Sequence, residues 1–477
     1  MPNPRLATVL QLRTALARQP GASAAGLAAA LGVSVPTLHR LLLQLQREAD
    51  ATPSSANPLI SAGKARRTRY ALARPLRGLQ TILPVYQVDR TGSVQTLTRL
   101  TPLQPEGTSM DLAGTPWPVP EEARDGWWDG LPYPLYHMRP QGYMGRQFAL
   151  AEHRRLAVSA NPQEWGDDDI LFVLSQSGAD LSGNLIVGDA ACEQWLAAKA
   201  AATEPVAEAG TGERYVQLAE QAIAAGVAGS SAAGEFPKFT TQRALAGSVT
   251  PHVLVKFSGT ENASAAVRRW SDLLVCEHLA LAHAATMPGI VSARSRVIAQ
   301  GGRTFLEVER FDRHGDFGRS PLCALEVLNA ALIGDGTMDW PHLTTRLAAL
   351  DLVSADDVDR VRHLWWYGRL IANTDMHTGN LSFMPHKEGS DKSGRLTLAP
   401  LYDMLPMRYA PLAGGEVPSR EFAPALPLPA EREAWRAACG AAIGFWREAA
   451  GDGRISEGFR GVCAVNGDEV ERLREKD

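Results

Sequence analysis

Apolar and polar residues alternate with a helical period over the first part of the chain. The pattern predicts three short helices, over residues 6–18, 24–31 and 35–48. Gly32 stops the second helix and Ser34 caps the third, so the turn between them is tight. Two apolar runs then predict strands over 59–61 and 68–72, around a turn rich in basic residues. Helices followed by such a hairpin are typical of a winged helix-turn-helix, which we assign to residues 1–78.

The predicted third helix has an apolar face and a polar face. Its leucines would face inward, and its exposed side would carry Thr37, His39, Arg40 and Gln44. Arginine and glutamine side chains can read base edges in the major groove, so Arg40 and Gln44 could do so here. The hairpin adds basic residues suited to phosphate contacts, which are Lys64, Arg66, Arg67 and Arg69. These two sets are the predicted DNA-binding residues. The alternatives are a solvated basic hairpin or a winged helix that contacts protein.

The net charge is distributed unevenly along the chain. Residues 1–78 contain eleven Lys and Arg against two acids, a net charge of +9, so the remaining residues sum to −13 within the total of −4. A basic head on an acidic body indicates a polyanionic partner for the head alone. This favours DNA as the partner, and it favours a homodimer, because helix-turn-helix proteins usually read paired half-sites.

Beyond the head, the pattern changes type several times. Residues 79–200 read as mixed strand and loop, with strands predicted over 82–88, 95–100, 170–174 and 183–188. A linker is predicted over 201–213, followed by helices over 214–225 and 266–286 and strands over 252–257, 295–299 and 304–309. From residue 321 onward the chain is predicted to be mostly helical, except for the Pro- and Gly-rich stretch 409–430.

The composition fits a globular protein of two or more domains. The chain has 477 residues, of which 45% are apolar and 21% are charged. No apolar run is long enough to span a membrane, and no signal-peptide core follows the N-terminus. The five cysteines are scattered and never form a CxxC pair, which argues against a thiolate zinc site. These features favour a cytoplasmic location and no membrane partner.

Three polar residues late in the chain have the spacing of a phosphoryl-transfer site. Asp375 lies in Asn373-Thr374-Asp375-Met376-His377-Thr378-Gly379-Asn380, and Asp403 follows a short apolar run. Protein kinases use an acid, a later amide and a second acid as the catalytic base and two metal ligands. Each residue alone is more often a turn or capping residue. It is the ordered set that favours Mg-ATP chemistry.

The other parts of such a site occur in the expected order. A Gly-rich turn over 226–239 could offer N–H groups to phosphates, and Lys256 near the end of a strand could reach them. Residues 307–311 are extended and could offer backbone groups to adenine. Asp316-Phe317-Gly318 spells the kinase metal motif, but it precedes the catalytic loop, whereas the metal acid should follow that loop. We therefore assign the metal role to Asp403.

These segments resemble the HipA family of bacterial toxin serine/threonine kinases. The resemblance is carried by residues 231–238, 255–257, 308–313, 373–380 and 401–403. It covers roughly residues 80–440. With its N-terminal head, the chain resembles the one-chain subgroup of that family, in which a DNA-binding module is fused to the kinase.

The resemblance implies a role for each motif residue. ATP contacts are implied for Gly234, Lys238, Lys256, Glu309, Arg310, Phe311 and His377. Among these, Lys256 would contact the phosphates, and residues 309–311 would form the adenine hinge. Asp375 is the implied catalytic base, and Asn380 and Asp403 are the implied Mg²⁺ ligands.

Ser231 matches the serine that the family autophosphorylates in its Gly-rich loop. Its modification would place negative charge where the ATP phosphates bind; the alternative is that Ser231 only forms a turn. The chain departs from the family at Gly379, where a lysine is frequent. The acid partner of Lys256 stays open, because Asp272 and Glu277 both lie on the predicted helix and on different faces of it.

The expected fold class is α+β, with a bilobal, protein-kinase-like body behind the head. The N-lobe would span 79–310, as an N-subdomain over 79–200 and a nucleotide-binding part over 201–310, and the helical catalytic C-lobe would span 311–477. The expected function is that of a Mg-ATP-dependent protein serine/threonine kinase of toxin type, fused to a module that binds its own operator. The resemblance adds a protein substrate, such as an aminoacyl-tRNA synthetase.

Two other functions stay open at the level of the sequence. One is a DNA-binding regulator whose kinase fold is inactive and senses ATP, which the departure at Gly379 motivates. The other is a metal-dependent nuclease that holds Mg²⁺ with Asp375, His377 and Asp403.

Overall fold

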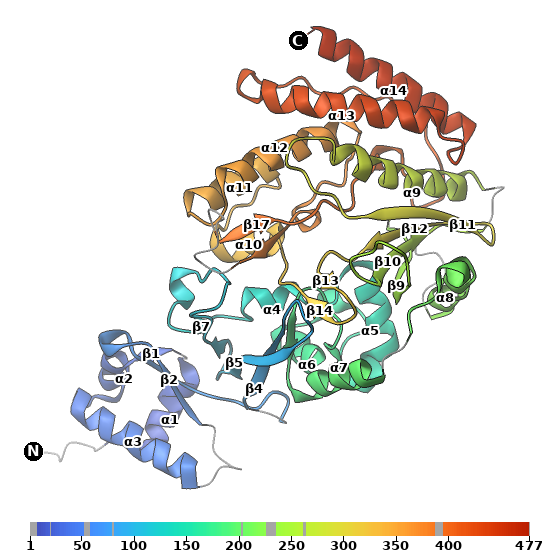
Figure 1. The fold of residues 1–477 in the computed structure, drawn as a ribbon. Coiled ribbons are helices and arrows are strands. Elements are labelled where there is room, and N and C mark those ends of the chain that lie inside the picture. Colours follow the sequence, from blue (N-terminus) through green and yellow to red (C-terminus); the bar gives the residue numbers. More distant parts are fainter. Residues whose placement is uncertain are drawn as a thin grey trace, which may run out of the picture.

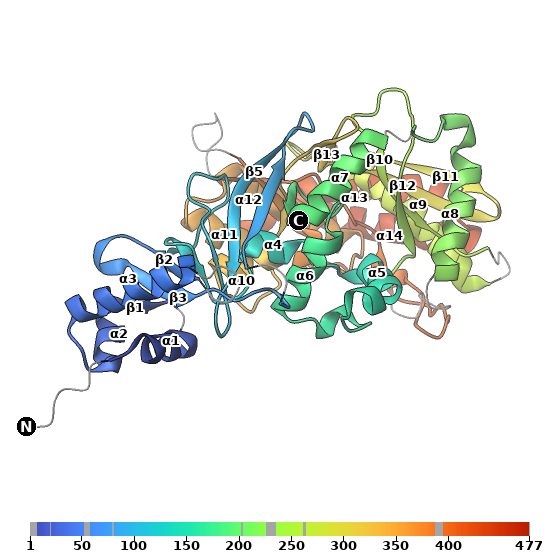
Figure 2. The same ribbon diagram turned by 90° about the horizontal axis from the view of Figure 1, so that it is seen from below.

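The structure is a computed structural model of the chain. It describes residues 7–19, 21–51, 58–78, 81–201, 204–225, 235–260, 264–386 and 395–476. Figure 1 shows the path from a small N-terminal head, through sheets and helices in the middle, to a pair of long C-terminal helices. The head stands at one end of the molecule in this view and again in the view from below (Figure 2).

The head, residues 7–78, folds as three helices and a small sheet. Its elements are α1 (Val9–Arg18), β1 (Ala22–Ser23), α2 (Ala24–Leu31), α3 (Val35–Ala51), β2 (Leu59–Ala62), η1 (Ala65–Arg67) and β3 (Arg69–Leu72). The strands pair antiparallel in the order β1-β3-β2. Thr8 and Gln11 form a capping box at the start of α1, and Gly32 ends α2 with a left-handed φ of 66°. These helices and strands lie within a few residues of the predicted ones.

The middle domain, residues 81–201, is an antiparallel sheet packed against helices. Its strands are β4 (Leu83–Val88), β5 (Val94–Pro102), β6 (Thr108–Met110), β7 (Trp127–Trp128) and β8 (Leu185–Val187), in the order β7-β6-β5-β4-β8. Its helices are α4 (Tyr133–His137), α5 (Gly142–Leu156), α6 (Asp167–Ser177) and α7 (Asp189–Ala201). Helices α6 and α7 both contact β8.

This domain holds more helix than the mixed strand-and-loop reading predicts. The strand predicted over 170–174 is wrong, because these residues belong to α6. Four of them are buried, so the apolar run has no polar face to reveal a helical period. Three acids at the first turn, Asp167 to Asp169, are the helix-start signal that the apolar run obscured.

A four-stranded antiparallel sheet follows. Its strands are β9 (Lys238–Gln242), β10 (His252–Phe257), β11 (Ser295–Gln300) and β12 (Arg303–Glu309), in the order β11-β12-β10-β9. Its helices are α8 (Thr211–Ala225) and α9 (Ala265–Ala284). The predicted linker ends earlier than expected, since α8 already begins at Thr211. Helix α9 begins at the Ser264 cap and contacts β10, β11 and β12.

The remainder of the chain is mostly helical, as predicted, with two small sheets. The helices are α10 (Leu325–Leu332), α11 (Trp340–Ala349), α12 (Ala355–Leu370), α13 (Arg432–Gly451) and α14 (Glu457–Lys476). The strands are β13 (Arg313–His314) and β14 (Gly318–Arg319), which form a hairpin, and β15 (Cys323–Ala324), β16 (Ser382–Pro385) and β17 (Leu396–Leu398), which form one sheet. The sequence pattern does not predict this second sheet.

The head and the body have largely separate cores, joined by a small apolar cluster of Ala71 with Leu103 and Trp127. The head buries its leucines from α1, α2, α3 and β3 in a cluster of its own, whereas the main cluster runs from the middle domain to α14. The head is tied to the body by Arg74, which donates to both carboxylate oxygens of Asp168 at 2.5 and 2.6 Å, and by Arg77, which pairs with Asp169.

By length and composition, no single helix in the described ranges could cross a membrane. The pair α2 and α3 meets that test only when taken together, and it is bent by 98°.

The separate core predicts that the head can be loosened without the body. Leu38 is 0% exposed, so Leu38→Ala should cost about 2–5 kcal/mol of head stability. Leu43 on the same helix is 55% exposed, so Leu43→Ala should change stability little. Hydrogen exchange followed by mass spectrometry should show faster exchange in α1–α3 for Leu38→Ala. For Leu43→Ala, exchange in these helices should stay as in the wild-type protein. Equal loss of protection in α9 and α13 would contradict separate cores.

Candidate active site

The site is built around a lysine buried in a hydrophobic strand. Lys256 lies on β10 and is 5% exposed. Its Nζ donates to both carboxylate oxygens of Glu277, each at 2.8 Å, and to Oδ1 of Asp403 at 2.6 Å. Three segments that are distant in the sequence therefore meet at one ammonium group.

The structure selects between the two acids of α9. Glu277 is 1% exposed and faces the sheet, where it meets Lys256. Asp272 lies on another face of the helix and accepts hydrogen bonds from the N–H and Oγ of Ser456, at 2.7 and 2.6 Å. Asp272 therefore anchors the segment before α14, and Glu277 is the partner of Lys256.

The charges of this cluster depend on one another. Burial disfavours the ammonium of Lys256, but Asp403 and Glu277 outweigh burial and raise its pKa. Burial alone would raise the pKa of Asp403, but the charges of Lys256 and Lys238 outweigh burial and lower this pKa to about 2. Burial dominates for Glu277 and raises its pKa to about 7 despite the adjacent Lys256. Lys256 and Asp403 thus form the charged pair at neutral pH, and Glu277 is the group that titrates there.

The loop after α12 holds the predicted catalytic acid in a fixed backbone. Asp375 donates its N–H to Oδ1 of Asn373 at 2.9 Å, and its C=O accepts from Nδ2 of Asn380 at 2.9 Å. Asn380 ends a 3-10 turn, η6 (Thr378–Asn380), and is buried. The side chain of Asp375 is half exposed. The loop therefore presents the Asp375 carboxylate to solvent on a rigid frame.

His377 and Gly379 complete this loop. Nδ1 of His377 accepts from the N–H of Gly379 at 3.1 Å, and its Nε2 lies 4.0 Å from Oδ1 of Asp375. A Cβ atom built on Gly379 would lie 2.9 Å from the His377 ring. A lysine at 379, as in the family pattern, would therefore require His377 to shift.

A tyrosine joins this loop to the second acid. The hydroxyl of Tyr402 donates to the C=O of Gly379 at 2.8 Å, and the next residue is Asp403, at a left-handed φ of 56°. Burial raises the pKa of Asp375, His377 lowers it, and the nearby carboxylate of Asp403 raises it further. The structure therefore brings Asp375, Asn380 and Asp403 together at one place.

The strand before Lys256 adds a second lysine. Lys238 on β9 pairs in register with Lys256 on β10. Burial lowers the pKa of Lys238, and the adjacent Lys256 lowers it further. Glu235 pairs with Arg146 of α5 at 2.5 Å. The remaining predicted residues of the Gly-rich turn, Ser231 and Gly234, lie outside the described residues.

The predicted hinge has fewer groups to offer than the sequence suggests. The N–H of Glu309 donates to the C=O of Arg294 at 2.8 Å, and the N–H of Arg310 donates to the C=O of His252 at 3.1 Å. Both side chains are also engaged, Glu309 by Arg243 at 2.9 Å and Arg310 by acids discussed below. The ring of Phe311, by contrast, lies 5.7 Å from that of Tyr402, beside the site.

The residues at this place fit a hard divalent cation. The Nδ2 of Asn380 is used as a donor, its Oδ1 accepts no hydrogen bond from the described residues, and Asp403 supplies a carboxylate. Mg²⁺ usually binds one or two protein oxygens and keeps several waters. Within the described ranges, no group of three or more His, Cys, Asp and Glu could hold a metal. A site of Asn380 and Asp403 is thus suited to Mg²⁺ shared with phosphates.

Two residues of this arrangement were not singled out by sequence reasoning. Tyr402 ties the two acid loops together, and Glu235 adds negative charge that acts on Asp375. The only signal for Tyr402 was its position next to Asp403. Asp316 lies on the hairpin between β13 and β14. A cavity of about 540 Å³ lies elsewhere, beside Val291 and Asp357.

The predicted DNA-binding residues lie on α3 and the β2–β3 hairpin. His39, Arg40 and Gln44 are exposed, whereas Thr37 is half-buried, and its Oγ1 lies 2.9 Å from Oγ of Ser34. Gln44 donates to Glu48 at 3.2 Å.

On the hairpin, Lys64, Arg67 and Arg69 are exposed. Arg67 lies 3.6 Å from Asp125 of the middle domain. The side chain of Arg66 lies outside the described part of the chain.

Two parts of the chain match known protein families. Residues 79–196 match the family model described as the middle domain of YjjJ-like toxins, and residues 230–454 match the HipA-like C-terminal domain. The toxin YjjJ of Escherichia coli strain K12 is 35% identical over 444 residues, which cover 93% of this chain and 96% of that protein. The chain belongs to the YjjJ-like toxin family.

The fold of this YjjJ-like protein is HipA-like. HipA of Shewanella oneidensis MR-1, solved in complex with HipB and its operator DNA, matches with a TM-score of 0.50 at 15% identity. The match covers 83% of this chain and 97% of that one. The resemblance to the HipA family is thus confirmed, and the expected mixed α/β body is confirmed as a HipA-like fold.

The pKa of Glu277 predicts a pH-dependent stability that one substitution removes. The folded protein keeps this proton up to about pH 7, whereas the unfolded chain releases it near 4.5, so this group makes stability fall as pH rises between them. Glu277→Gln cannot titrate and should flatten the slope of unfolding free energy over this window. Chemical denaturation at several pH values measures the slope. The exposed Glu220→Gln should keep the wild-type slope. An unchanged slope in Glu277→Gln would contradict the raised pKa.

Proposed function

We propose that this YjjJ-like protein is a Mg-ATP-dependent protein serine/threonine kinase of the HipA toxin type, fused to a DNA-binding head. The observation that supports the kinase most directly is the double contact of Lys256 with Glu277 and Asp403. Protein kinases require a strand lysine paired with a helix glutamate, and a metal-binding aspartate beside them. Family membership supports the same activity, and the N-lobe of 79–310 and C-lobe of 311–477 are the proposed catalytic halves.

Each residue has a role that follows from its geometry. Asp375 would accept the proton of a substrate hydroxyl, because its carboxylate is half exposed and its pKa is raised by burial. Lys256 and Lys238 would bind phosphate oxygens with paired positive charge. Asn380 and Asp403 would hold Mg²⁺ through their oxygens. Mg-ATP would supply the phosphoryl group and the metal charge that offsets it.

The adenine would bind at the end of β12. The N–H groups of Glu309 and Arg310 are used within the protein, whereas the N–H of Phe311 has no hydrogen-bond partner among the residues that the structure describes. We therefore assign the hinge donor to Phe311. His377 and Gly234 stay proposed contacts of the phosphates. Phosphate on Ser231 would place negative charge beside Lys238 and Lys256 and compete with ATP.

The departure at Gly379 supports a second candidate, an inactive kinase fold that senses ATP for the DNA-binding head. The family lysine would add one more cation beside the phosphates, and this chain has none at that position. ATP-stabilised melting without any phosphorylated product would favour this candidate. The third candidate, a nuclease, would nick plasmid DNA in a manner that depends on Asp403 and not on ATP.

The catalytic assignment predicts which substitution removes phosphoryl transfer. With labelled ATP and Mg²⁺, the purified wild-type protein should label itself. Asp375→Ala should reduce the rate by on the order of 100-fold or more, since general-base contributions are of this size. Mass spectrometry should find the phosphate on Ser231. The control is Asp356→Ala, an exposed acid on α12 that should keep the wild-type rate. Retained labelling in Asp375→Ala would remove the assignment of the base.

The DNA-binding function rests on the geometry of the head. Helices α2 and α3 meet at 98° and are joined by the three residues Gly32, Val33 and Ser34. An angle near 90–120° and a short turn with glycine are typical of a helix-turn-helix. Arg40 and Gln44 would read bases, and Lys64, Arg66, Arg67 and Arg69 would contact phosphates. Thr37 and His39 stay proposed DNA contacts on α3.

The partners follow from this assignment. The HipA neighbour was solved with HipB and operator DNA, which supports DNA as a partner of this protein as well. We propose that the protein binds its own operator as a homodimer, because paired half-sites require two heads. The proposed substrate is a cytoplasmic protein, such as an aminoacyl-tRNA synthetase.

The head predicts two different effects on DNA binding. On duplex DNA from upstream of the protein's own coding region, Arg40→Ala should cost about 1–3 kcal/mol and relax sequence preference. Lys64→Ala should weaken binding to all sequences and reduce the salt slope by about 1. Fluorescence anisotropy at several salt concentrations measures both. Arg362→Ala, at an exposed arginine on α12, is the matched control. Binding that none of these substitutions changes would place the DNA contact elsewhere.

A further inference from the structure

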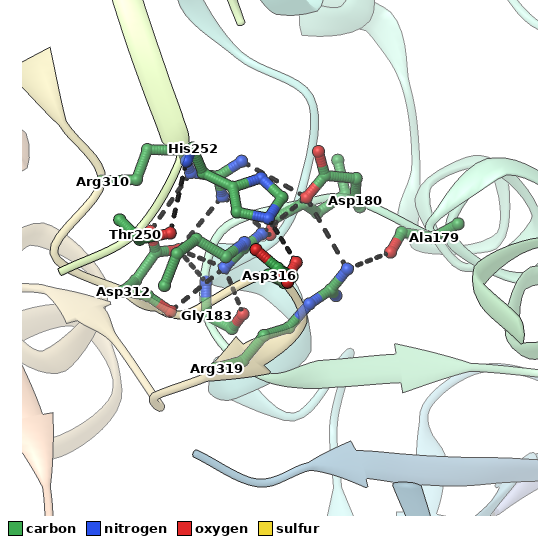
Figure 3. A network of polar contacts seen from close by, with 11 residues as sticks. Ala179, Asp180, Gly183, Thr250, His252, Arg310, Asp312, Asp316 and Arg319 are labelled. Atoms are coloured by element: carbon green, nitrogen blue, oxygen red, sulfur yellow. Dashed lines mark hydrogen bonds and ion pairs between the residues drawn. The ribbon is translucent and has the colours of Figure 1, made fainter. Parts of the chain in front are cut away.

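A second cluster of buried charge lies where the β13–β14 hairpin meets the middle domain (Figure 3). Arg313 approaches Asp180 at 2.7 Å and Asp312 at 2.7 Å. Arg310 approaches the same two acids at 3.3 and 3.1 Å. Arg319 reaches only Asp180, at 3.6 Å. Three guanidinium groups thus share two carboxylates.

The charge that lacks its own carboxylate belongs to Arg319. This side chain is 4% exposed, and its Nη2 donates to the C=O of Ala179 at 2.7 Å. Its Nη1 is buried without a hydrogen-bond partner in the part of the chain that the structure describes. Burial and the adjacent Arg313 lower the pKa of Arg319 to about 9. A buried cation in this position is costly unless an anion neutralises it.

A cavity of about 310 Å³ adjoins this cluster. Arg319 and Arg313 line it from the hairpin, and Lys199 lines it from α7. Nζ of Lys199 donates to the C=O of Gly92 at 2.6 Å, which leaves two of its three donors. The cavity is larger than a lone oxyanion requires and lies at the low end of the size range of small-molecule sites.

The other walls are partly apolar and partly acidic. Trp195 and Phe317 line the cavity, and their ring centroids lie 5.2 and 5.6 Å from Nζ of Lys199. Three exposed acids, Asp180, Asp316 and Glu204, also line it. Asp180 is shared among three arginines and lies 3.6 Å from Arg319, whereas Asp316 and Glu204 form no ion pair with Arg319 or Lys199 among the described residues. The acids of the cavity therefore neutralise the buried Arg319 only in part.

We propose that this cavity binds a small organic phosphate monoester. Its phosphate would bind Arg319 and Lys199, and its organic part would lie against Trp195 and Phe317. A guanidinium binds the oxygens of a phosphate dianion with two parallel donors, and an ammonium adds a point charge. The aromatic walls favour an ester over inorganic phosphate. The ligand would supply the negative charge that the three arginines lack.

This site is separate from the proposed nucleotide site, although the two are connected. Arg310 belongs to the cluster and directly precedes Phe311 of the proposed hinge. The N–H of Arg319 donates to the C=O of Asp89 in the middle domain at 2.9 Å. A ligand here would therefore join the hairpin after the hinge to the middle domain.

Isothermal titration of the full chain with phenyl phosphate tests the proposal. Arg319→Gln and Lys199→Gln should each weaken binding on the order of tenfold, because each removes one charge-assisted contact. Lys256→Gln, in the proposed kinase site, and the exposed Arg362→Gln should leave binding unchanged. The first control separates this site from the nucleotide site, so either proposal can fail alone. If Arg319→Gln does not fold, as judged by circular dichroism, the titration of Lys199→Gln tests the proposal instead, because Lys199 is only half-buried.

Three outcomes would overturn the proposal. The first is no binding of phenyl phosphate up to about 10 mM, a concentration at which even weak specific sites fill. The second is binding that Lys199→Gln and Arg319→Gln both leave intact. The third is equally strong binding of inorganic phosphate or of benzoate, which would show that the ester or the phosphate is not recognised.

Discussion

The buried ammonium of Lys256 is the interaction on which the proposed site depends. A charge inside a protein costs several kcal/mol in lost hydration unless opposite charges and hydrogen bonds replace the water. Here Asp403, from the segment after β17, provides the opposite charge, and Glu277 of α9 and Asp403 both accept hydrogen bonds from Nζ. The requirement to neutralise one group thus fixes three parts of the chain relative to one another. Loss of either acid would leave the ammonium of Lys256 in an apolar strand with too few groups to replace its hydration.

This constraint extends to the catalytic loop through the backbone. Leu401, just before Asp403, exchanges hydrogen bonds with Val291 and Ala293, each at 2.8 Å, so the segment is held against the turn before β11. Tyr402 then fixes the C=O of Gly379, and Asp403 itself takes a left-handed conformation that costs a non-glycine residue energy. Such strain persists only where the surroundings impose it. The position of the Asp403 carboxylate therefore depends on the ordered backbone around it, which the hydrogen bonds of Leu401 and Tyr402 hold in place.

The sequence predicted the elements better than it predicted their contacts. The order of Lys256, Asp375, Asn380 and Asp403 can be read from local patterns, because each residue follows a strand or lies in a short polar loop. The choice of Glu277 over Asp272 cannot, because it depends on how α9 is rotated against the sheet. That rotation is set by packing along the whole helix.

The hinge and the arginine cluster show the same limit. An extended run at 307–311 predicts a strand end, but not that two of its N–H groups are already used by Arg294 and His252. The cluster joins Asp180 to residues more than a hundred positions later, so no local pattern contains it. The Asp316-Phe317-Gly318 motif shows the opposite error. Its sequence matches a kinase metal motif, but it lies on the β13–β14 hairpin, where Asp316 and Phe317 line the second cavity.

The structure also shows that the positive charge of the head is partly paired with acids of the body. Of its basic residues, Arg74, Arg77 and Arg67 pair with acids of the middle domain, so part of the +9 is neutralised by the body. The pairs of Arg74 and Arg77 are half-buried and hold the head in place. Arg67 is 61% exposed and its pair is long, and exposed pairs of this kind contribute about 0–1 kcal/mol. In the proposed complex, a DNA phosphate could therefore displace Asp125 from Arg67 at little cost. Helix α3 carries Arg40 and Arg47 against Glu48 and Asp50 and so adds no net charge, which makes the hairpin the more basic of the two proposed DNA-binding elements.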